Sequence, residues 1–181
     1  GVHQGIAAFA AAFEYSSLDD LFALATERQE PVFLIVADGI EDPHNLGAII
    51  RTAECAGAHG LIIGERRSVS VTGTVVKASA GATAYFKVAR VGNIASAIDE
   101  IKEKGVFVYG ADMEGEDYRR VDLSGNVCLV VGSEGRGVSR LVKDKCDQLV
   151  SLPQKGQLNS LNASVAAGIM MYEVVRARQS R

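Results

Sequence analysis

The 181-residue chain has few of the residues that build disulfide frameworks and metal sites, with only 3 cysteines and 3 histidines. These residues are Cys55, Cys128, Cys146, His3, His44 and His59. The cysteines form no C-x-x-C pair, so we expect reduced thiols in a reducing, cytoplasmic compartment. The histidines are widely spaced and lack a supporting set of cysteines, so we expect no metal site.

The chain also lacks an apolar run of membrane length, a signal peptide and an excess of positive charge. We therefore expect no association with a membrane. The net charge of −3 creates no global basic field, so any binding of nucleic acid must depend on local patches. What the chain has in abundance is glycine. Its 19 glycines against 3 prolines predict tight turns and close backbone contacts rather than disorder.

Continuous apolar runs alternate with segments of helical periodicity along the chain. The apolar runs predict buried strands over residues 31–38, 59–64, 86–91, 106–111, 127–132 and 147–153. Helices are predicted over residues 16–30, 45–58, 72–82, 93–105, 138–146 and 160–181, the first with Ser17 as its N-cap. This alternation predicts an α/β domain with a mostly parallel sheet.

Four polar or glycine-rich clusters follow predicted strands. They begin after Asp38, Tyr109, Val131 and Leu152. Because the carboxyl ends of parallel strands meet at one edge of a sheet, and ligands bind at that edge, we expect the functional site there.

The first cluster is DGIEDPHNLGAIIRTAE, residues 38–54. Pro43 suits a turn that leads into a helix. Asn45 could cap that helix, and capping explains it about as well as a functional role does. Arg51 is an isolated cation on a helix otherwise rich in Gly, Ala, Ile and Leu, where a solvated face is the simplest explanation.

The second cluster is LVVGSEGRGVSRL, residues 129–141. Its G-x-x-G-x-G spacing reverses the dinucleotide fingerprint, and it lies late in the chain rather than after the first strand. A phosphate cradle requires bare backbone N–H groups and positive charge, yet this turn carries the carboxylate of Glu134. A turn in which Glu134 caps the next helix is the alternative to a ligand site.

The third cluster is SLPQKGQLNSLNASVAAG, residues 151–168. Ser160, Asn162 and Ser164 stand at the start of a helix whose next residues are small, and small residues allow a backbone or a ligand to approach closely. A capped helix with an alanine-rich packing face is the alternative.

Arginines gather in three further places, and guanidinium groups match phosphates bidentately. They are the tail residues Arg176, Arg178 and Arg181 and the pairs Arg66–Arg67 and Arg119–Arg120. For the tail, a solvated helix end stabilised by the helix dipole is the competing explanation.

Three of these segments together resemble the motifs of the SpoU family, also called TrmH-like, of RNA 2′-O-ribose methyltransferases. DPHNLGAIIRTAECAG is similar to the first motif, LVVGSEGRGVSRL to the second and VSLPQKGQLNSLNASVAAGIMMYE to the third. Their order and spacing agree with the family, and the resemblance covers about residues 31–178. Within the family it is nearest to the bacterial enzymes that methylate a guanosine of 23S rRNA.

The resemblance implies a SPOUT-type fold, in which helices cover both faces of a six-stranded, mostly parallel sheet and the carboxyl-terminal part forms a trefoil knot. It also implies a homodimer, RNA as the substrate and S-adenosyl-L-methionine as the methyl donor, with no metal. This donor carries adenine, ribose and a sulfonium but no phosphate. A glycine-rich turn with a carboxylate can therefore bind it without a cationic cradle.

The resemblance assigns catalysis to Arg51, Asn45, Glu134 and Asn162. A free guanidinium has a pKa above about 12 and is a poor general base, so Arg51 would bind the adjacent phosphate and stabilise the developing alkoxide. The other three side chains would hold Arg51 and the ribose. The positions that match cofactor contacts are Gly110, Gly132, Leu152, Ser160 and Leu161. The predicted RNA contacts are Arg51, Arg176 and Arg178.

We expect residues 1–30 to form an N-terminal junction and helix, and residues 31–181 to form the catalytic domain. The opening HQGI resembles the junction at which such enzymes join an upstream RNA-recognition domain. Three alternatives stay open: tRNA as the substrate, a non-catalytic RNA-binding module and a nucleotide-dependent oxidoreductase. The joint presence of Arg51, Glu134 and Asn162 favours an enzyme, and the missing dinucleotide fingerprint counts against the oxidoreductase.

Overall fold

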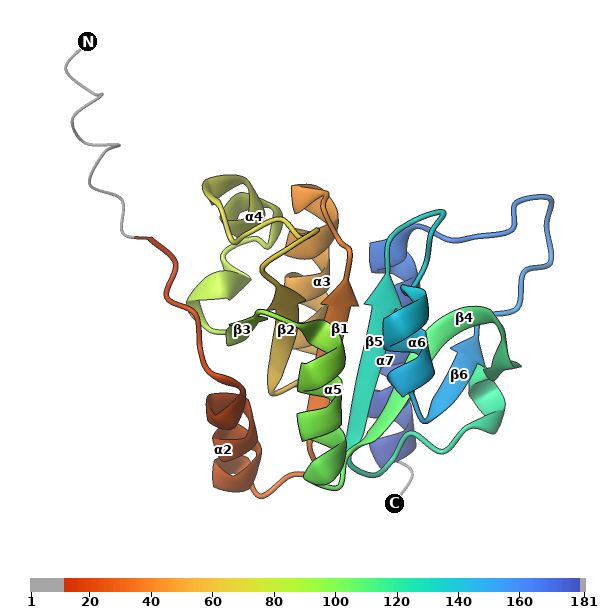
Figure 1. The fold of residues 1–181 in the computed structure, drawn as a ribbon, viewed down its shortest axis with the longest axis horizontal. Helices are drawn as coiled ribbons and strands as arrows, with labels where there is room; N and C mark the ends of the chain where they lie inside the picture. Colours follow the sequence, from red (N-terminus) through yellow and green to blue (C-terminus); the bar gives the residue numbers. More distant parts are fainter. Residues whose placement is uncertain (1–11, 180–181) are drawn as a thin grey trace, which may run out of the picture.

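Six strands form one sheet in the order β3-β2-β1-β5-β4-β6 in the computed structural model, which describes residues 12–179 (Figure 1). The strands are β1 (Phe33–Asp38), β2 (Gly60–Gly64), β3 (Val88–Val91), β4 (Phe107–Asp117), β5 (Val127–Gly132) and β6 (Gln148–Ser151). All neighbouring strands run parallel, so the predicted α/β class and six-stranded parallel sheet are confirmed. The trefoil knot stays a prediction. The opening HQGI and Arg181 lie outside the described residues.

Helices cover both faces of the sheet (Figure 1). They are α2 (Leu18–Arg28), α3 (Pro43–Cys55), α4 (Gly73–Ala78), α5 (Ile94–Glu103), α6 (Arg140–Lys145) and α7 (Ala163–Gln179), with short 3₁₀ turns η1 (Ala82–Ala84) and η2 (Tyr118–Arg120). Helices α2, α5 and α6 contribute to the core on one face, and α3, α4 and α7 to the core on the other. The sheet is therefore the middle layer of three.

Strand β1 shows why its sequence is apolar without alternation. Phe33, Ile35 and Ala37 point into the core beneath α3 and α7, whereas Leu34 and Val36 point into the core beneath α2 and α5. Because both faces are covered, every position of the strand is buried.

Most predicted elements are observed, and Ser17 caps α2 through a capping box with Asp20. Several boundaries differ by one to three residues, and two differ by more. Helix α4 ends at Ala78 instead of residue 82, because Ala80 and Gly81 adopt the left-handed backbone conformation. Strand β4 continues to Asp117 instead of residue 111, because its backbone pairs with β6 beyond a bulge. That extension needs no apolar side chains, so hydrophobic patterning could not predict it.

The carboxyl ends of the strands lie together at the top edge in Figure 1. The loops β1–α3, β2–α4, β5–α6 and β6–α7 leave the sheet there, and they contain five of the candidate site residues predicted from the sequence: Glu134, Leu152, Ser160, Leu161 and Asn162. The amino ends of the strands and the end of α7 lie at the opposite edge (Figure 1).

Candidate functional site

Three polar side chains from three motifs meet at the carboxyl edge of the sheet. Asn162 Nδ2 donates to Glu134 Oε1 at 2.5 Å and to Asn45 Oδ1 at 3.1 Å. Asn45 Nδ2 approaches the same Glu134 oxygen at 3.5 Å. Residues separated by up to 117 positions therefore form one hydrogen-bonded unit, which we call the polar cluster.

The polar cluster is anchored to the start of α7. Asn162 Oδ1 accepts hydrogen bonds from the backbone N–H groups of Ser164 at 2.9 Å and Val165 at 3.2 Å, which makes Asn162 the helix N-cap. Glu134 Oε1 also lies 3.4 Å from the backbone nitrogen of Ala163, where the helix dipole favours a negative charge. The second carboxylate oxygen of Glu134 has no partner among residues 12–179 and stays open to a ligand.

The structure corrects two alternatives considered from the sequence. Asn45 does not cap α3, because Asp42 is the N-cap and accepts the His44 N–H, with Pro43 following it. Glu134 does not cap α6, whose N-cap residue is Ser139 without a side-chain capping bond. Asp42 before Pro43 is a recognisable start signal that would have located the cap.

A cavity of about 470 Å³, which we call the apolar cavity, opens beside the polar cluster. Its walls include the apolar residues Val131, Val150, Leu152, Leu161, Ala163 and Ala166, together with residues 132–137 and the polar residues Asp112, Glu114, Ser151, Gln154 and Asn159. Lys143 also lines it, but its Nζ lies 2.6 Å from Asp112 Oδ2. This lysine lowers the pKa of the Asp112 carboxyl from its ordinary value, and the cation is already paired.

Four of the five residues predicted to contact a cofactor line the apolar cavity: Gly132, Leu152, Ser160 and Leu161. Gly110 does not line it. A Cβ at Gly110 would approach Cys146 Sγ to 2.8 Å, so this glycine permits close packing behind the cavity wall. At Gly132 a Cβ would come within 2.1 Å of the Gly137 carbonyl carbon, so the shape of the β5–α6 loop requires glycine.

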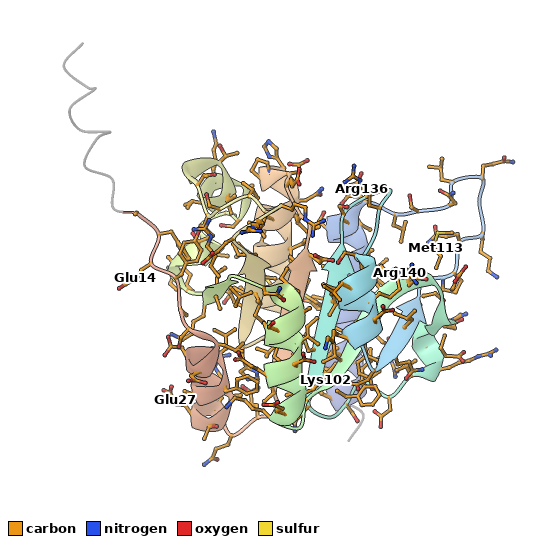
Figure 2. All side chains as sticks on the ribbon, viewed as in Figure 1. Glu14, Glu27, Lys102, Met113, Arg136 and Arg140 are labelled. Atoms are coloured by element: carbon orange, nitrogen blue, oxygen red, sulfur yellow. The ribbon has the colours of Figure 1, made fainter. Side chains whose placement is uncertain are left out.

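A second cavity, of about 450 Å³, lies on the other side of the β5–α6 loop, and we call it the charged cavity. It is lined by Asp38, Gly39, Ile40, Glu41, Asp42, Asn45, Arg67, Ser133, Glu134, Arg136, Gly137 and Ser139. Residues 133, 134, 136 and 137 belong to both cavities, so this loop is their common wall. Figure 2 shows Arg136 at the upper edge of the molecule. The sequence indicated Arg67 only as half of a basic pair, because no spacing rule links it to this loop.

The structure does not bring the predicted arginines to the polar cluster. Arg51 is exposed and lines neither cavity. It follows Asn45 by six residues on α3, which places it about 9 Å further along the helix axis at a rise of about 1.5 Å per residue. Arg178 lies at the opposite end of α7, where its Nη2 donates to Val32 O at 3.0 Å and Gly125 O at 3.1 Å. Arg176 pairs with Glu173. RNA contact by these residues stays a prediction.

A shallow apolar groove runs between α3 and α7. It is lined by Ala48, Thr52, Ser164, Val165, Gly168, Ile169 and Tyr172. Val165, Ile169 and Tyr172 are 50%, 39% and 49% exposed, which is high for apolar residues on a helix that packs against the sheet.

No group of His, Cys, Asp or Glu side chains within residues 12–179 is arranged to hold a metal ion. Within the same residues, no helix is long and apolar enough to cross a membrane.

The protein is thus a parallel α/β domain in which two cavities adjoin at one polar cluster. The chain matches the SpoU rRNA Methylase family over residues 32–172. It is 53% identical to YacO of Bacillus subtilis (strain 168), which is named for the TrmH family of tRNA/rRNA methyltransferases, over 98% of this chain and 72% of that protein.

Solved structures agree with this match. The SpoU methyltransferase AviRb of Streptomyces viridochromogenes in complex with the cofactor AdoMet is 29% identical, with a TM-score of 0.82, over 93% of this chain and 67% of that chain. An RNA 2′-O ribose methyltransferase is 26% identical, with a TM-score of 0.75, over 94% of this chain and 62% of that chain. The chain therefore belongs to the SpoU/TrmH family of RNA methyltransferases, and the predicted resemblance is confirmed.

Proposed function

We propose that the protein transfers a methyl group from S-adenosyl-L-methionine to a ribose 2′-hydroxyl of RNA, in a guanosine of 23S rRNA. The observation that carries this proposal is the common wall of the two cavities. A transfer reaction requires donor and acceptor to meet, and the polar cluster lies where the apolar cavity and the charged cavity adjoin.

The apolar cavity suits the cofactor. Its volume of about 470 Å³ falls in the range of roughly 300–1,000 Å³ of small-molecule sites. Val131, Val150 and Leu152 would offer apolar contact to the cofactor, and residues 132–137 would border it. The paired state of Lys143 also fits, since this donor has no phosphate to bind. The cofactor of AviRb, a relative with the same fold, supports the assignment.

The chain's residues must then align the two reactants. When bound, S-adenosyl-L-methionine supplies a methyl group on a sulfonium, which is a strong donor. The 2′-oxygen would take this methyl group, leaving S-adenosylhomocysteine as a neutral thioether, and the proton of the hydroxyl would pass to the open carboxylate oxygen of Glu134. Good alignment contributes up to roughly 7–11 kcal/mol. The open oxygen of Glu134 can accept a hydrogen bond from the hydroxyl, while Asn45 and Asn162 fix that carboxylate.

A homodimer completes the proposal. The groove between α3 and α7 leaves Val165, Ile169 and Tyr172 exposed, and a second copy of the chain would cover them. Arg51 borders this groove between Ala48 and Thr52. Arg51 would then act at the interface with the second copy, which would explain why it lies far from the polar cluster of its own chain.

The dimer is tested by light scattering at micromolar concentration. The wild-type chain should have the mass of a dimer, and Ile169→Glu should reduce it to that of a monomer. Val76→Glu is the matched control, because Val76 is also 39% exposed but lies on α4. A monomeric wild-type chain would contradict the proposed assembly.

One methyl-transfer assay tests both the proposed chemistry and the proposed substrate. Unmodified 23S rRNA and tRNA transcripts are incubated with tritiated S-adenosyl-L-methionine, and the labelled nucleotide is identified after complete digestion. We expect 2′-O-methylguanosine in 23S rRNA. Label only in tRNA would establish the alternative substrate. Binding of RNA without any transfer would establish the non-catalytic module, and tight binding of NAD would support the oxidoreductase.

An upstream RNA-recognition domain stays a prediction. If such a domain supplies much of the affinity for RNA, residues 1–181 alone should bind the cofactor but methylate rRNA slowly. Restoring the upstream segment should then raise the rate at matched salt. Equal rates would show that residues 1–181 carry their own RNA specificity.

A further inference from the structure

Two arginines face the charged cavity from different loops. Arg67 comes from the β2–α4 loop and Arg136 from the β5–α6 loop. Both are exposed, and neither makes a hydrogen bond or an ion pair with any side chain or backbone group among residues 12–179. Arg136 also lines the apolar cavity, where Lys143 is by contrast paired with Asp112. Two guanidinium groups without a direct partner among the described residues therefore face the charged cavity from two sides.

The loop that carries Arg67 is fixed in place. The backbone N–H of Val69 donates to Ile40 O at 3.1 Å, and the N–H of Val71 donates to Tyr15 Oη at 2.9 Å. Arg67 itself has a φ of 51°, in the left-handed region that residues other than glycine rarely occupy. Such strained residues persist where neighbouring contacts enforce them, and they gather at ligand sites. The loop thus presents the Arg67 side chain at the cavity with little freedom of its backbone.

The same cavity also contains carboxylates. Two of them accept hydrogen bonds from the backbone. Asp38 Oδ2 accepts the Ser139 N–H at 2.7 Å, and Asp42 Oδ1 accepts the His44 N–H at 2.8 Å. Glu41 is exposed and has no partner among the described residues. A site for a bare phosphate would not place four carboxylates, those of Asp38, Glu41, Asp42 and Glu134, around it. A nucleotide in an RNA strand fits the mixture, since its phosphates are anionic and its base carries N–H donors.

We propose that the charged cavity receives the nucleotide to be methylated, and that Arg67 and Arg136 bind the phosphates on either side of its ribose. This inference rests on the proposed function and assigns its substrate site. A nucleotide held there would present its ribose to the common wall, where the open oxygen of Glu134 lies next to the apolar cavity. Guanidinium groups suit this task because they bind phosphate oxygens in pairs.

The test compares Arg67→Ala and Arg136→Ala with Arg66→Ala. Arg66 is the adjacent exposed arginine and lines neither cavity, so it controls for loss of one positive charge in the same loop. Arg67→Asn is added because asparagine tolerates the left-handed backbone, which separates loss of the guanidinium from a change in loop shape. The full chain is used, with an unmodified 23S rRNA transcript as the probe.

Three quantities are measured for each variant. Affinity for S-adenosyl-L-methionine by titration calorimetry should not change for Arg67→Ala, Arg67→Asn and Arg66→Ala, because Arg66 and Arg67 do not line the apolar cavity. The KM for the transcript should rise about tenfold for Arg67→Ala, Arg67→Asn and Arg136→Ala, with kcat nearly unchanged at saturating RNA. The slope of log affinity against log salt should fall by about 0.7–0.9 for each lost phosphate contact. Arg66→Ala should match the wild type in all three.

Several outcomes would overturn the inference. If Arg67→Ala and Arg136→Ala behave like Arg66→Ala, the arginines do not bind the substrate. If Arg67→Ala or Arg67→Asn loses affinity for S-adenosyl-L-methionine, the charged cavity belongs to the cofactor, because Arg67 lines only that cavity. A wild-type chain that binds no S-adenosyl-L-methionine contradicts the proposed function itself, which distinguishes that failure from failure of the substrate site.

Discussion

The two ends of the sheet use similar side chains for different purposes. At the carboxyl edge, Glu134, Arg67 and Arg136 have charged atoms without partners in the described chain. At the amino edge, His59 is fully buried, and its Nδ1 accepts the Phe33 N–H at 3.0 Å while Nε2 lies 3.3 Å from Glu30 Oε1. The buried polar group at the amino edge is used to hold the fold together, whereas the exposed groups at the carboxyl edge are available to ligands.

Helix α7 connects these two regions and shows the difference within one element. At its start the N-cap residue, Asn162, belongs to the polar cluster. At its last turn Arg178 is partly buried, donates to two carbonyl oxygens and stacks 5.3 Å from the centre of the Phe33 ring. Burial lowers the pKa of the Arg178 guanidinium from its ordinary value, and its Nε has no hydrogen-bond partner. The geometry therefore favours a structural role for Arg178, although RNA contact was predicted from its sequence.

The largest expected effect is that of Arg51→Ala on turnover. Removing one group that stabilises developing charge typically lowers kcat by about 10²–10³-fold. Affinity for S-adenosyl-L-methionine should stay the same, because Arg51 lines neither cavity. Tritium transfer and titration calorimetry measure the two quantities, with Arg66→Ala as the control. A large loss of cofactor affinity would instead place Arg51 in the cofactor site.

The second prediction concerns the wall between the cavities. In Gly132→Ala the new Cβ would overlap the backbone of Gly137, so the β5–α6 loop must move. We expect a loss of about 1–3 kcal/mol in the free energy of unfolding and a marked loss of cofactor affinity. Gly125→Ala is the matched control, because a Cβ there would have nothing within 4 Å. Equal urea midpoints for the two variants would show that the loop tolerates the displacement.

The sequence predicted the fold better than the geometry of the site. Apolar runs located all six strands, because strands buried on both faces must be apolar throughout. The resemblance to the family also selected Asn45, Glu134 and Asn162, which the structure brings together. The charged cavity could not be predicted, because it depends on how the β2–α4 loop is tied to Ile40. Nor could Arg178 be distinguished from a solvated cation, since its partners are backbone carbonyls distant in sequence.

The third prediction is that the carboxyl end of α7, unlike its amino end, contributes to stability and not to methyl transfer. Arg178→Ala removes two hydrogen bonds and the stacking on Phe33, so we expect about 1–3 kcal/mol lower stability in urea unfolding. The methyl-transfer rate per folded molecule should not change. Arg120→Ala is the control, since Arg120 is 78% exposed and forms only a long ion pair with Glu116. Weaker RNA binding at unchanged stability would restore the RNA-binding role predicted from the tail.

The smallest expected effect is the pH dependence that His59 gives to stability. Burial is the main cause that lowers the pKa of His59 below its ordinary value of 6.5, and the hydrogen bond to Glu30 only partly opposes it. The structure explains why the pKa of His59 is lowered: Nδ1 accepts the Phe33 N–H, and a proton on Nδ1 would break that hydrogen bond. Arg28 and Arg178 also disfavour the charged imidazole.

The sign of the effect follows from proton binding. Below pH 6.5 the unfolded chain protonates this imidazole while the folded chain resists, so the unfolded state binds more protons. The contribution is fully present above pH 6.5 and is lost as the pH falls from there toward the folded pKa, by at most about 1.4 kcal/mol per pH unit. Urea unfolding at pH 7.5 and 5.5 should show this loss in the wild type and in the His44→Gln control. In His59→Gln the loss should be smaller, and an equal loss in all three proteins would show that other groups cause it.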